Sequence, residues 1–306
     1  MSRLDKTLED YLSVRRALGF KLVREGMLLP GFVAYLESHG SAFITTELAL
    51  QWAMQPAAAA SYWWATRLRL VRGFAKYVRA FDPRTEVPSA DLIPYRKQRI
   101  TPYLYTNADI RALLEACQRI RGPLGAATYE TLFGLLAATG MRVGEAIGLD
   151  RCDFKENEEL LVVRHSKFDK SREVLLHSTA VESLRAYARK RDRIVGRRKS
   201  PSFLLSQAGT RLFSQNVWQT FARLRKWAGL PLRPRPPRIH DLRHSFAVHT
   251  LLRWYRAGVD VESRIAVLST YLGHVNPSTT YWYLTAAPEL MGLAAQRLED
   301  AQGELP

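Results

Sequence analysis

A proline-rich stretch, DPRTEVPSADLIPYRKQRITPYL at residues 82–104, divides the chain into two parts. It contains four prolines and no apolar periodicity, so neither a long helix nor a strand is expected across it. Segments with apolar residues at helical spacing precede and follow it. We therefore predict two domains, at residues 1–87 and 102–306, joined by a basic, extended linker at 88–101.

The first domain is predicted to be helical. The segment TLEDYLSVRRALGF places Leu8, Tyr11, Leu12 and Leu18 near one face of a helix. Two further helical segments follow, MLLPGFVAYLESHG and TTELALQWAMQ, and the second of these has a threonine N-cap at Thr45 or Thr46.

A fourth helical segment, SYWWATRLRLVRGFAKYVRAF, interleaves aromatic and basic residues. Its apolar residues fall roughly on one stripe, so we interpret them as core and not as a surface that stacks on DNA bases. The basic residues lie on the polar side. Arg72 and Lys76 are therefore predicted to contact DNA phosphates.

The second domain is predicted to be mainly helical with one small β-sheet or hairpin. TNADIRALLEACQRI and YETLFGLLAATG read as helices, the second ended by Gly140. Residues 160–164 and 172–176 change to strand-like patterns around a polar turn. After a helix at STAVESLRAYARKRDRIV we expect a short strand in SFLLS, a helix capped by Ser214, and helix from about His240 to Asp300.

The charge pattern points to a polyanion partner. The net charge is +16, and no Asp or Glu occurs between Arg193 and His240. A solvated basic surface is the alternative, but such a run would repel itself without an anion to bind. Double-stranded DNA is the expected partner, with these predicted phosphate contacts in the run: Arg197, Arg198, Lys199, Arg223, Arg225 and Lys226.

Several classes of protein are disfavoured by composition. No apolar stretch is long enough to span a bilayer, and the charged start MSRLDKTLEDYL lacks a signal-peptide core. The two cysteines, Cys117 and Cys152, are far apart, which argues against a disulfide framework and a cysteine zinc site. We expect a cytoplasmic protein associated with the nucleoid and no membrane partner.

Polar residues interrupt apolar segments at three places. Arg142 stands two residues after a glycine in TGMRVGEAIGL, the segment IHDLRHSF carries His240, Arg243 and His244, and LGHVNPSTTYWY carries a histidine and a tyrosine pair. His240 and His244 have the spacing of a zinc pair, but the glutamate of HExxH and a third ligand are missing. Each tyrosine alone would be interpreted as core.

Together the three places resemble the tyrosine recombinase family, also called phage integrases. The resemblance covers about residues 102–290, and the helical N-terminal region is similar to the family's core-binding, SAM-like domain. It implies that a tyrosine hydroxyl attacks a DNA phosphodiester, forms a 3′-phosphotyrosyl bond and frees a 5′-hydroxyl. A second strand then reverses the step, without ATP, metal or another cofactor.

The resemblance also implies site residues. The nucleophile maps to Tyr283, with Tyr281 as the competitor, and the remaining catalytic positions map to Arg142, Lys167, His240, Arg243 and His274. The roles implied are phosphate binding by Arg142, Arg243 and His274, general base by His240 and general acid by Lys167. Lys170 is the alternative in the same turn, and Glu145 is expected to orient Arg142.

The resemblance implies assembly as well. We expect a homotetramer on DNA, joined through the C-terminal helix, with accessory recombinases or DNA-bending proteins as further partners; packing of that helix on its own domain is the alternative. The segment between Arg243 and His274 is longer than usual, which resembles recombinases carried by transposons. Two alternative functions remain at this point, DNA relaxation of the type IB topoisomerase kind and DNA binding without catalysis.

Overall fold

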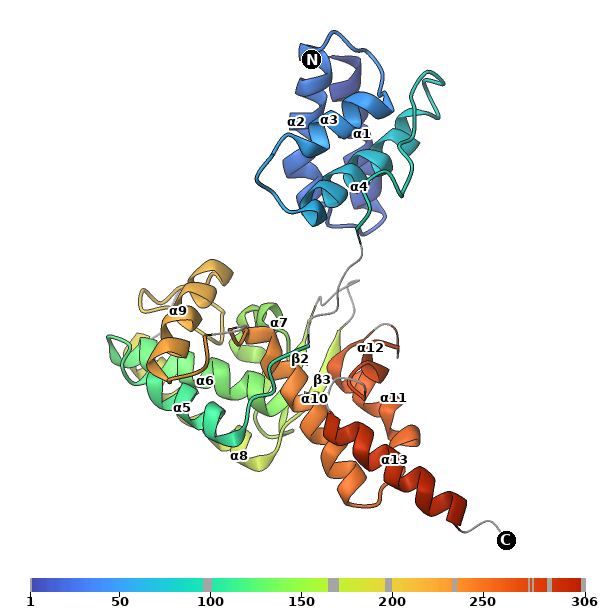
Figure 1. Cartoon of the computed structure of the whole chain (residues 1–306). Coiled ribbons are helices and arrows are strands. Elements are labelled where there is room, and N and C mark those ends of the chain that lie inside the picture. The colour runs from blue at the N-terminus through green and yellow to red at the C-terminus, as the bar shows by residue number, and fades with distance from the viewer. Residues whose placement is uncertain are drawn as a thin grey trace. The chain divides into compact units, whose positions relative to one another are not determined.

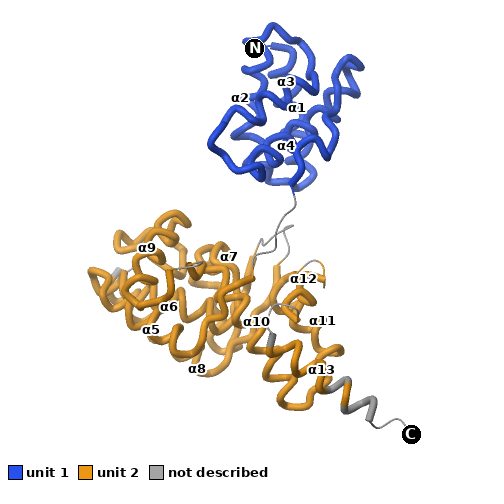
Figure 2. Tube along the Cα trace, in the orientation of Figure 1, with its two compact units in different colours: residues 1–100 blue, residues 101–306 orange. Residues whose placement is uncertain are grey.

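The computed structural model describes residues 2–95, 101–164, 171–195, 200–232, 236–274, 276, 278–284 and 288–303. The chain separates into two compact units, Met1–Ile100 and Thr101–Pro306 (Figure 2). Each unit has its own hydrophobic core, as expected of domains.

The first unit is built from helices whose apolar faces meet in one core. Leu8, Tyr11 and Leu12 are buried there as predicted, but Leu18 is 68% exposed. The prediction for Leu18 was wrong because the first helix ends one residue earlier and Leu18 is its C-cap. The helices are α1 (Arg3–Ala17), α2 (Val23–Ser38), α3 (Thr46–Met54), which Thr45 caps, and α4 (Ser61–Val78).

The segment after α4 packs on the first unit for part of its length. Arg72 donates hydrogen bonds from Nε and Nη2 to the carbonyl oxygens of Pro88 and Ser89, both at 2.8 Å. Ile93 is buried against the same core. The beginning of the stretch predicted as a linker is therefore held by α4, and two donors of Arg72 serve that purpose.

The second unit is mainly helical with a small sheet, which confirms the predicted fold class (Figure 1). Three antiparallel strands lie in the order β1-β2-β3. The elements are α5 (Asn107–Cys117), α6 (Pro123–Thr139), α7 (Val143–Gly148), a 3-10 turn at Arg151–Asp153, β1 (Phe154–Lys155), β2 (Leu160–Val163), β3 (Arg172–Leu175), α8 (Ser178–Val195), α9 (Ser214–Trp227), α10 (Ile239–Arg256), α11 (Val261–Leu272), α12 (Ser278–Tyr281) and α13 (Pro288–Gly303).

Two details of the second unit differ from the sequence-based expectation. The apolar run SFLLS forms no strand of the sheet: it makes only isolated β-bridges, Ser202 with Asp150 and Leu205 with Arg211, and the carbonyls of Ser202 and Phe203 accept hydrogen bonds from the guanidinium of Arg191. Ser214 begins α9 instead of capping it, since Phe213 holds the N-cap position without a side-chain hydrogen bond.

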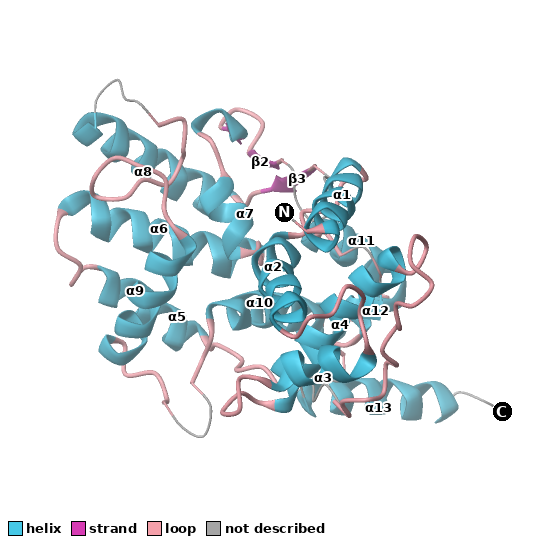
Figure 3. Ribbon diagram, turned by 90° about the horizontal axis from the view of Figure 1, so that it is seen from above, coloured by secondary structure: helices cyan, strands magenta, loops and turns pink. Residues whose placement is uncertain are grey.

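The hairpin of β2 and β3 lies between α7 and α11, which sets up the functional site (Figures 1 and 3). Val163 pairs with Arg172 at the open end of the described ladder. Helix α10 packs against α6 on one side and α13 on another. The ends of α6 and α11, the start of α10 and the strand β3 thereby converge.

Gly140, the C-cap of α6, allows this convergence. Its φ is +63°, a left-handed conformation that glycine adopts without strain. A Cβ there would lie 2.6 Å from the ring of Phe246 in α10.

We predict that Gly140→Ala lowers the free energy of unfolding by about 1–3 kcal/mol, because it adds backbone strain and a steric overlap. Urea unfolding measures the change. The matched control is Gly134→Ala in the same helix, where the new Cβ makes only an ordinary 3.9 Å contact; it should be neutral or stabilising by up to about 1 kcal/mol. Equal stability of Gly140→Ala and the wild type would contradict the packing argument.

Candidate active site

The C-terminal end of α11 is the meeting point of the polar motifs. Helix ends leave backbone carbonyls without intrahelical partners. Here the carbonyl oxygens of three successive residues each accept a hydrogen bond from a different guanidinium: Tyr271 from Arg172 Nε at 3.0 Å, Leu272 from Arg243 Nη2 at 2.7 Å, and Gly273 from Arg142 Nη2 at 3.0 Å. The partial negative charge of a helix C-terminus favours such cations.

Gly273 makes the approach possible. It ends α11 in the left-handed region with φ +69°, and a Cβ there would lie 2.8 Å from Nη1 of Arg172. His274 follows directly, and its amide closes the turn on the carbonyl of Ser269 at 2.9 Å. Gly273 therefore positions His274 and also leaves room for the guanidinium of Arg172.

Arg142 sits at the N-cap of α7, held by Glu145. Its backbone amide donates to Glu145 Oε2 at 2.9 Å and its Nη1 to Oε1 at 2.7 Å. The side chain of Arg142 remains 30% exposed, whereas that of Glu145 is 7% exposed. The predicted orienting role of Glu145 has this contact as its support.

Sequence analysis did not identify Arg172 as a residue of the site. It comes from β3 and donates to both oxygens of Glu145, at 3.0 and 2.8 Å. Its only sequence signal is a charge in a short strand, which usually marks a solvated face, whereas its side chain is 12% exposed.

Arg243 is the most deeply placed cation of the group. The residue is 2% exposed, and its Nη1 donates to the carbonyl oxygen of Gly140 at 2.8 Å. Burial, followed by the nearby charge of Arg142, lowers its pKa to about 10. It is still charged at pH 7, so the fold keeps a permanent cation there.

Tyr283 lies close enough to Arg243 for the guanidinium to act on the pKa of its hydroxyl. The residue is 2% exposed, whereas Tyr281 is 44% exposed. Burial raises the pKa of Tyr283, and the charge and hydrogen bond of Arg243 act against that rise. Of the two competing tyrosines, Tyr283 is therefore the one gathered with the arginines.

Two of the predicted histidines, His274 and His240, lie near Tyr283 and Arg243. The ring of His274 stacks on that of Tyr283 with centroids 5.9 Å apart, and its Nδ1 lies 2.7 Å from Oγ1 of the buried Thr280. Desolvation, then the charge of Arg243, lowers the pKa of His274 to about 3 and that of His240 to about 4. His240 keeps an exposed surface. Both rings are neutral near pH 7.

His244 lies inside this aromatic group. Its ring is 4.8 Å from that of His240 and 5.4 Å from that of Tyr283, centroid to centroid. Among the residues that the structure describes, none forms a hydrogen bond with its buried Nδ1. In the described part of the chain, no three His, Cys, Asp or Glu side chains are grouped as a metal site would require.

The remaining predicted residues of the second unit, the hairpin lysines and the DNA contacts, fall into two groups. Lys167 and its alternative Lys170, together with Arg197, Arg198 and Lys199, lie outside the described residues. On α9, Arg223 and Lys226 are exposed, whereas Arg225 donates to the carbonyl of Pro237 at 2.9 Å.

The run without acidic residues is partly neutralised from outside. Arg211 pairs with Asp150 at 2.5 Å and Arg238 with Asp241 at 2.8 Å. Self-repulsion in this run is therefore smaller than the sequence suggested, because its carboxylate partners come from neighbouring segments of the chain.

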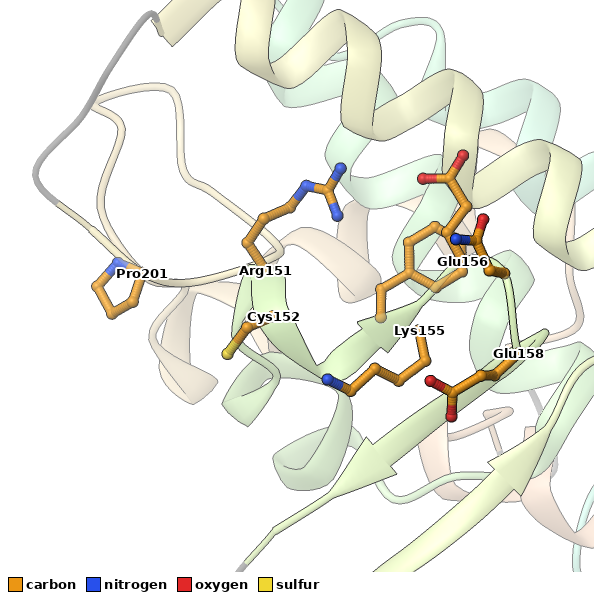
Figure 4. Close-up of a pocket in the computed structure, with 8 residues that line it drawn as sticks. Arg151, Cys152, Lys155, Glu156, Glu158 and Pro201 are labelled. Carbon is orange, nitrogen blue, oxygen red and sulfur yellow. The ribbon is translucent and has the colours of Figure 1, made fainter.

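A surface pocket of about 660 Å³ opens elsewhere in the unit, beside β1 (Figure 4). Its lining includes Arg151, Cys152, Lys155, Glu156, Glu158 and Pro201, none of which belongs to the three motifs. No helix in the described ranges is both long and apolar enough to cross a membrane.

The gathered side chains suit reaction at a phosphodiester. Two guanidiniums, Arg142 and Arg243, can stabilise charge that develops on non-bridging oxygens. Neutral histidines can accept or share a proton, and Tyr283 offers a hydroxyl that can attack. All of these groups come from one chain.

Comparisons with known proteins agree with this chemistry. Residues 104–289 match the phage integrase family. The chain is 44% identical to "Putative integrase/recombinase y4rB" of Sinorhizobium fredii (strain NBRC 101917 / NGR234) over 98% of each chain.

Solved structures show the same fold. The integrase of transposon Tn1549, in complex with transposon right end DNA, has a TM-score of 0.67 at 16% identity and covers 96% of this chain and 98% of its own. A lambda integrase tetramer bound to a Holliday junction has a TM-score of 0.60 at 18% identity, covering 90% of this chain and 78% of its own.

The buried histidines predict a stability that falls in mild acid. Because the pKa values of His244 and His274 are lowered in the fold to about 4 and about 3, the unfolded chain binds protons below about pH 6.5 that the folded chain does not. The free energy of unfolding should therefore drop by on the order of 2 kcal/mol between pH 7 and 4.5, after allowance for partial exposure.

Urea unfolding at several pH values measures this slope. His274→Asn should flatten it, while His177→Gln, at an exposed histidine of the same unit, should leave it unchanged. A His274→Asn profile parallel to that of the wild type would refute the assignment.

Proposed function

The chain belongs to the phage integrase family of tyrosine recombinases and is a site-specific DNA recombinase, and we propose that Tyr283 is the nucleophile that breaks each DNA strand. The observation that carries the proposal is the position of the buried Tyr283, whose ring stacks on that of His274 directly after the two carbonyls that bind Arg243 and Arg142. The wider match of the family to residues 104–289 includes every motif that contributes to that site.

The proposed reaction has two balanced steps. The hydroxyl oxygen of Tyr283 attacks phosphorus and loses its proton to His240, while the bond from phosphorus to the 5′-oxygen breaks and that oxygen is protonated. A 3′-phosphotyrosyl bond and a 5′-hydroxyl result. The 5′-hydroxyl of a second strand then attacks the phosphotyrosine and gives its proton to Lys167, while the bond from phosphorus to the Tyr283 oxygen breaks and His240 returns the proton to that oxygen. A phosphodiester is restored, so that no external energy source is needed.

The remaining catalytic residues have the following proposed roles in the first step. Arg142 and Arg243 bind the non-bridging oxygens, as preorganised donors that need no rearrangement when charge develops. His274, fixed by Thr280, hydrogen-bonds the phosphate. Lys167 remains the proposed general acid for the departing oxygen.

DNA is the partner, and the family acts as oligomers on it. We propose a tetramer on DNA, which the lambda integrase tetramer on a Holliday junction supports. Helix α13 begins against its own unit, where Leu290 is 1% exposed beside α10, while Met291 is 55% exposed. That exposed face is the proposed contact with a neighbouring protomer; accessory recombinases or bending proteins would add to the same assembly.

The Tn1549 relative supports action on a mobile element, and we propose integration, excision or transposition as the biological reaction. DNA relaxation of the type IB kind would use the same residues without pairing two sites. Exchange of strands between two labelled duplexes separates the two functions.

We predict that Tyr283→Phe abolishes covalent attachment to DNA and retains DNA affinity, because only the attacking oxygen is removed. The test incubates the protein in EDTA with labelled, nicked fragments from the DNA that flanks its gene, and resolves the products on denaturing gels. Filter binding of the same fragments measures affinity.

Tyr281→Phe is the matched control, two residues away on the exposed side of the turn. It should form the protein-linked band at the wild-type level. A band that survives in Tyr283→Phe and disappears in Tyr281→Phe would transfer the nucleophile to Tyr281; no band with any protein would oppose catalysis on these fragments.

Binding should also weaken steeply with salt, since phosphate contacts release counterions. We expect the double variant Arg223→Gln/Lys226→Gln on α9 to reduce the slope of log affinity against log salt by about 1–2. The control Arg189→Gln/Lys190→Gln removes the same charge from α8. Slopes that are equal for the two double variants would reject α9 as a phosphate-binding surface.

A further inference from the structure

We propose that Arg172 is a positioning residue for strand cleavage: it balances the charge of Glu145, so that Arg142 keeps its own positive charge for the scissile phosphate. This inference rests on the proposed function of Arg142 as a phosphate ligand. It assigns to β3 a part in the reaction that none of the motif residues supplies.

Glu145 is shared between two arginines. Its carboxylate accepts two hydrogen bonds from Arg172, at 3.0 and 2.8 Å, and two from Arg142, one of which comes from the backbone amide. Arg142 thus gives Glu145 only one side-chain N–H, while Arg172 gives it a pair in the bidentate form that a planar fork allows.

The three side chains are ordered by depth. Arg172 is 12% exposed, Glu145 is 7% exposed and Arg142 is 30% exposed. Arg142 is therefore the member that an approaching phosphate can reach, with the carboxylate and the second guanidinium behind it.

The charges explain why a second arginine is needed. A carboxylate paired with Arg142 alone would cancel its charge at the place where negative charge develops on the phosphate. With Arg172 present, the three groups together carry one net positive charge. Glu145 can then orient Arg142 without neutralising it, and the field acts in a partly buried setting where screening is weak.

The pKa of Glu145 agrees with this division. Burial acts to raise it, but the hydrogen bonds and charge of Arg172, followed by the hydrogen bonds from Arg142, hold it at about 2. The carboxylate stays ionised throughout the working range, and Arg172 is its stronger partner.

Arg172 also joins three elements that carry the site. It extends from β3, binds Glu145 in α7 and donates from Nε to the carbonyl of Tyr271 at the end of α11. One lysine ammonium could not make this set of contacts with the same geometry, because its donors leave a single atom.

The test compares single-turnover cleavage by Arg172 variants on the nicked fragment that the wild type attaches to. Arg172→Met should lower the rate at saturating DNA by about tenfold or more, while the DNA concentration at half-saturation changes less than about threefold. Arg172→Lys keeps the charge and loses the fork, so its rate should be intermediate. Thermal unfolding of each variant verifies that it is folded.

A second substitution separates charge balance from support of the fold. Arg172→Met/Glu145→Gln removes the carboxylate that would neutralise Arg142, so it should cleave faster than Arg172→Met alone. Loss of structural support would instead make the double variant equal or slower. The matched pair is Arg185 with Glu156, joined at 2.7 Å in the same unit; Arg185→Met and Arg185→Met/Glu156→Gln should both cleave at the wild-type rate.

The inference fails if Arg172→Met cleaves within about twofold of the wild type, or if the double variant is no faster than that single variant. If the wild type forms no covalent product, the proposed function fails and a measurement without DNA decides the inference. Inorganic phosphate, compared with sodium chloride of equal ionic strength, should raise the unfolding temperature of the wild type and the double variant more than that of Arg172→Met. Equal stabilisation of all three would overturn it.

Discussion

The end of α11 is the feature on which the site depends. Three consecutive carbonyl oxygens there bind three guanidiniums that come from α7, β3 and α10. Because all three arginines use the same helix end, consecutive carbonyls of one turn help to set their mutual spacing. The left-handed glycine that closes the helix is what lets this many planar cations approach one turn.

Such a concentration of positive charge is costly without partners, and the fold supplies them by different means. Arg243 donates to the carbonyl oxygens of Gly140 and Leu272, whereas Arg142 and Arg172 share the charge of Glu145. The guanidiniums proposed to bind phosphate are therefore held by acceptors that occupy only part of their hydrogen-bonding capacity. This is preorganisation of the kind that makes electrostatic stabilisation effective.

The sequence allowed prediction of the mainly helical fold with its small sheet, and it located the segments that meet at Tyr283. Apolar spacing and glycine caps are local signals, so α5, α6, α8 and the hairpin could be predicted within a few residues. Arg172 could not be found, because its partners lie 27 and 99 residues away. The same limit applies to SFLLS, whose partners are isolated β-bridges to Asp150 and Arg211 and the guanidinium of Arg191. Residue pattern alone does not show which distant group satisfies a backbone carbonyl.

His240 and His274 link proton binding to the binding of a phosphate diester in the site. Desolvation is the main cause of their low pKa values, and the charges of Arg243 and Arg142 add to it. A phosphate diester in the site would cancel that second contribution, which raises the proton affinity of His240 and His274 relative to the empty site. By linkage, whatever raises their proton affinity on binding also makes binding tighter in mildly acidic solution. The DNA strand would thus adjust the basicity of the groups that act on it.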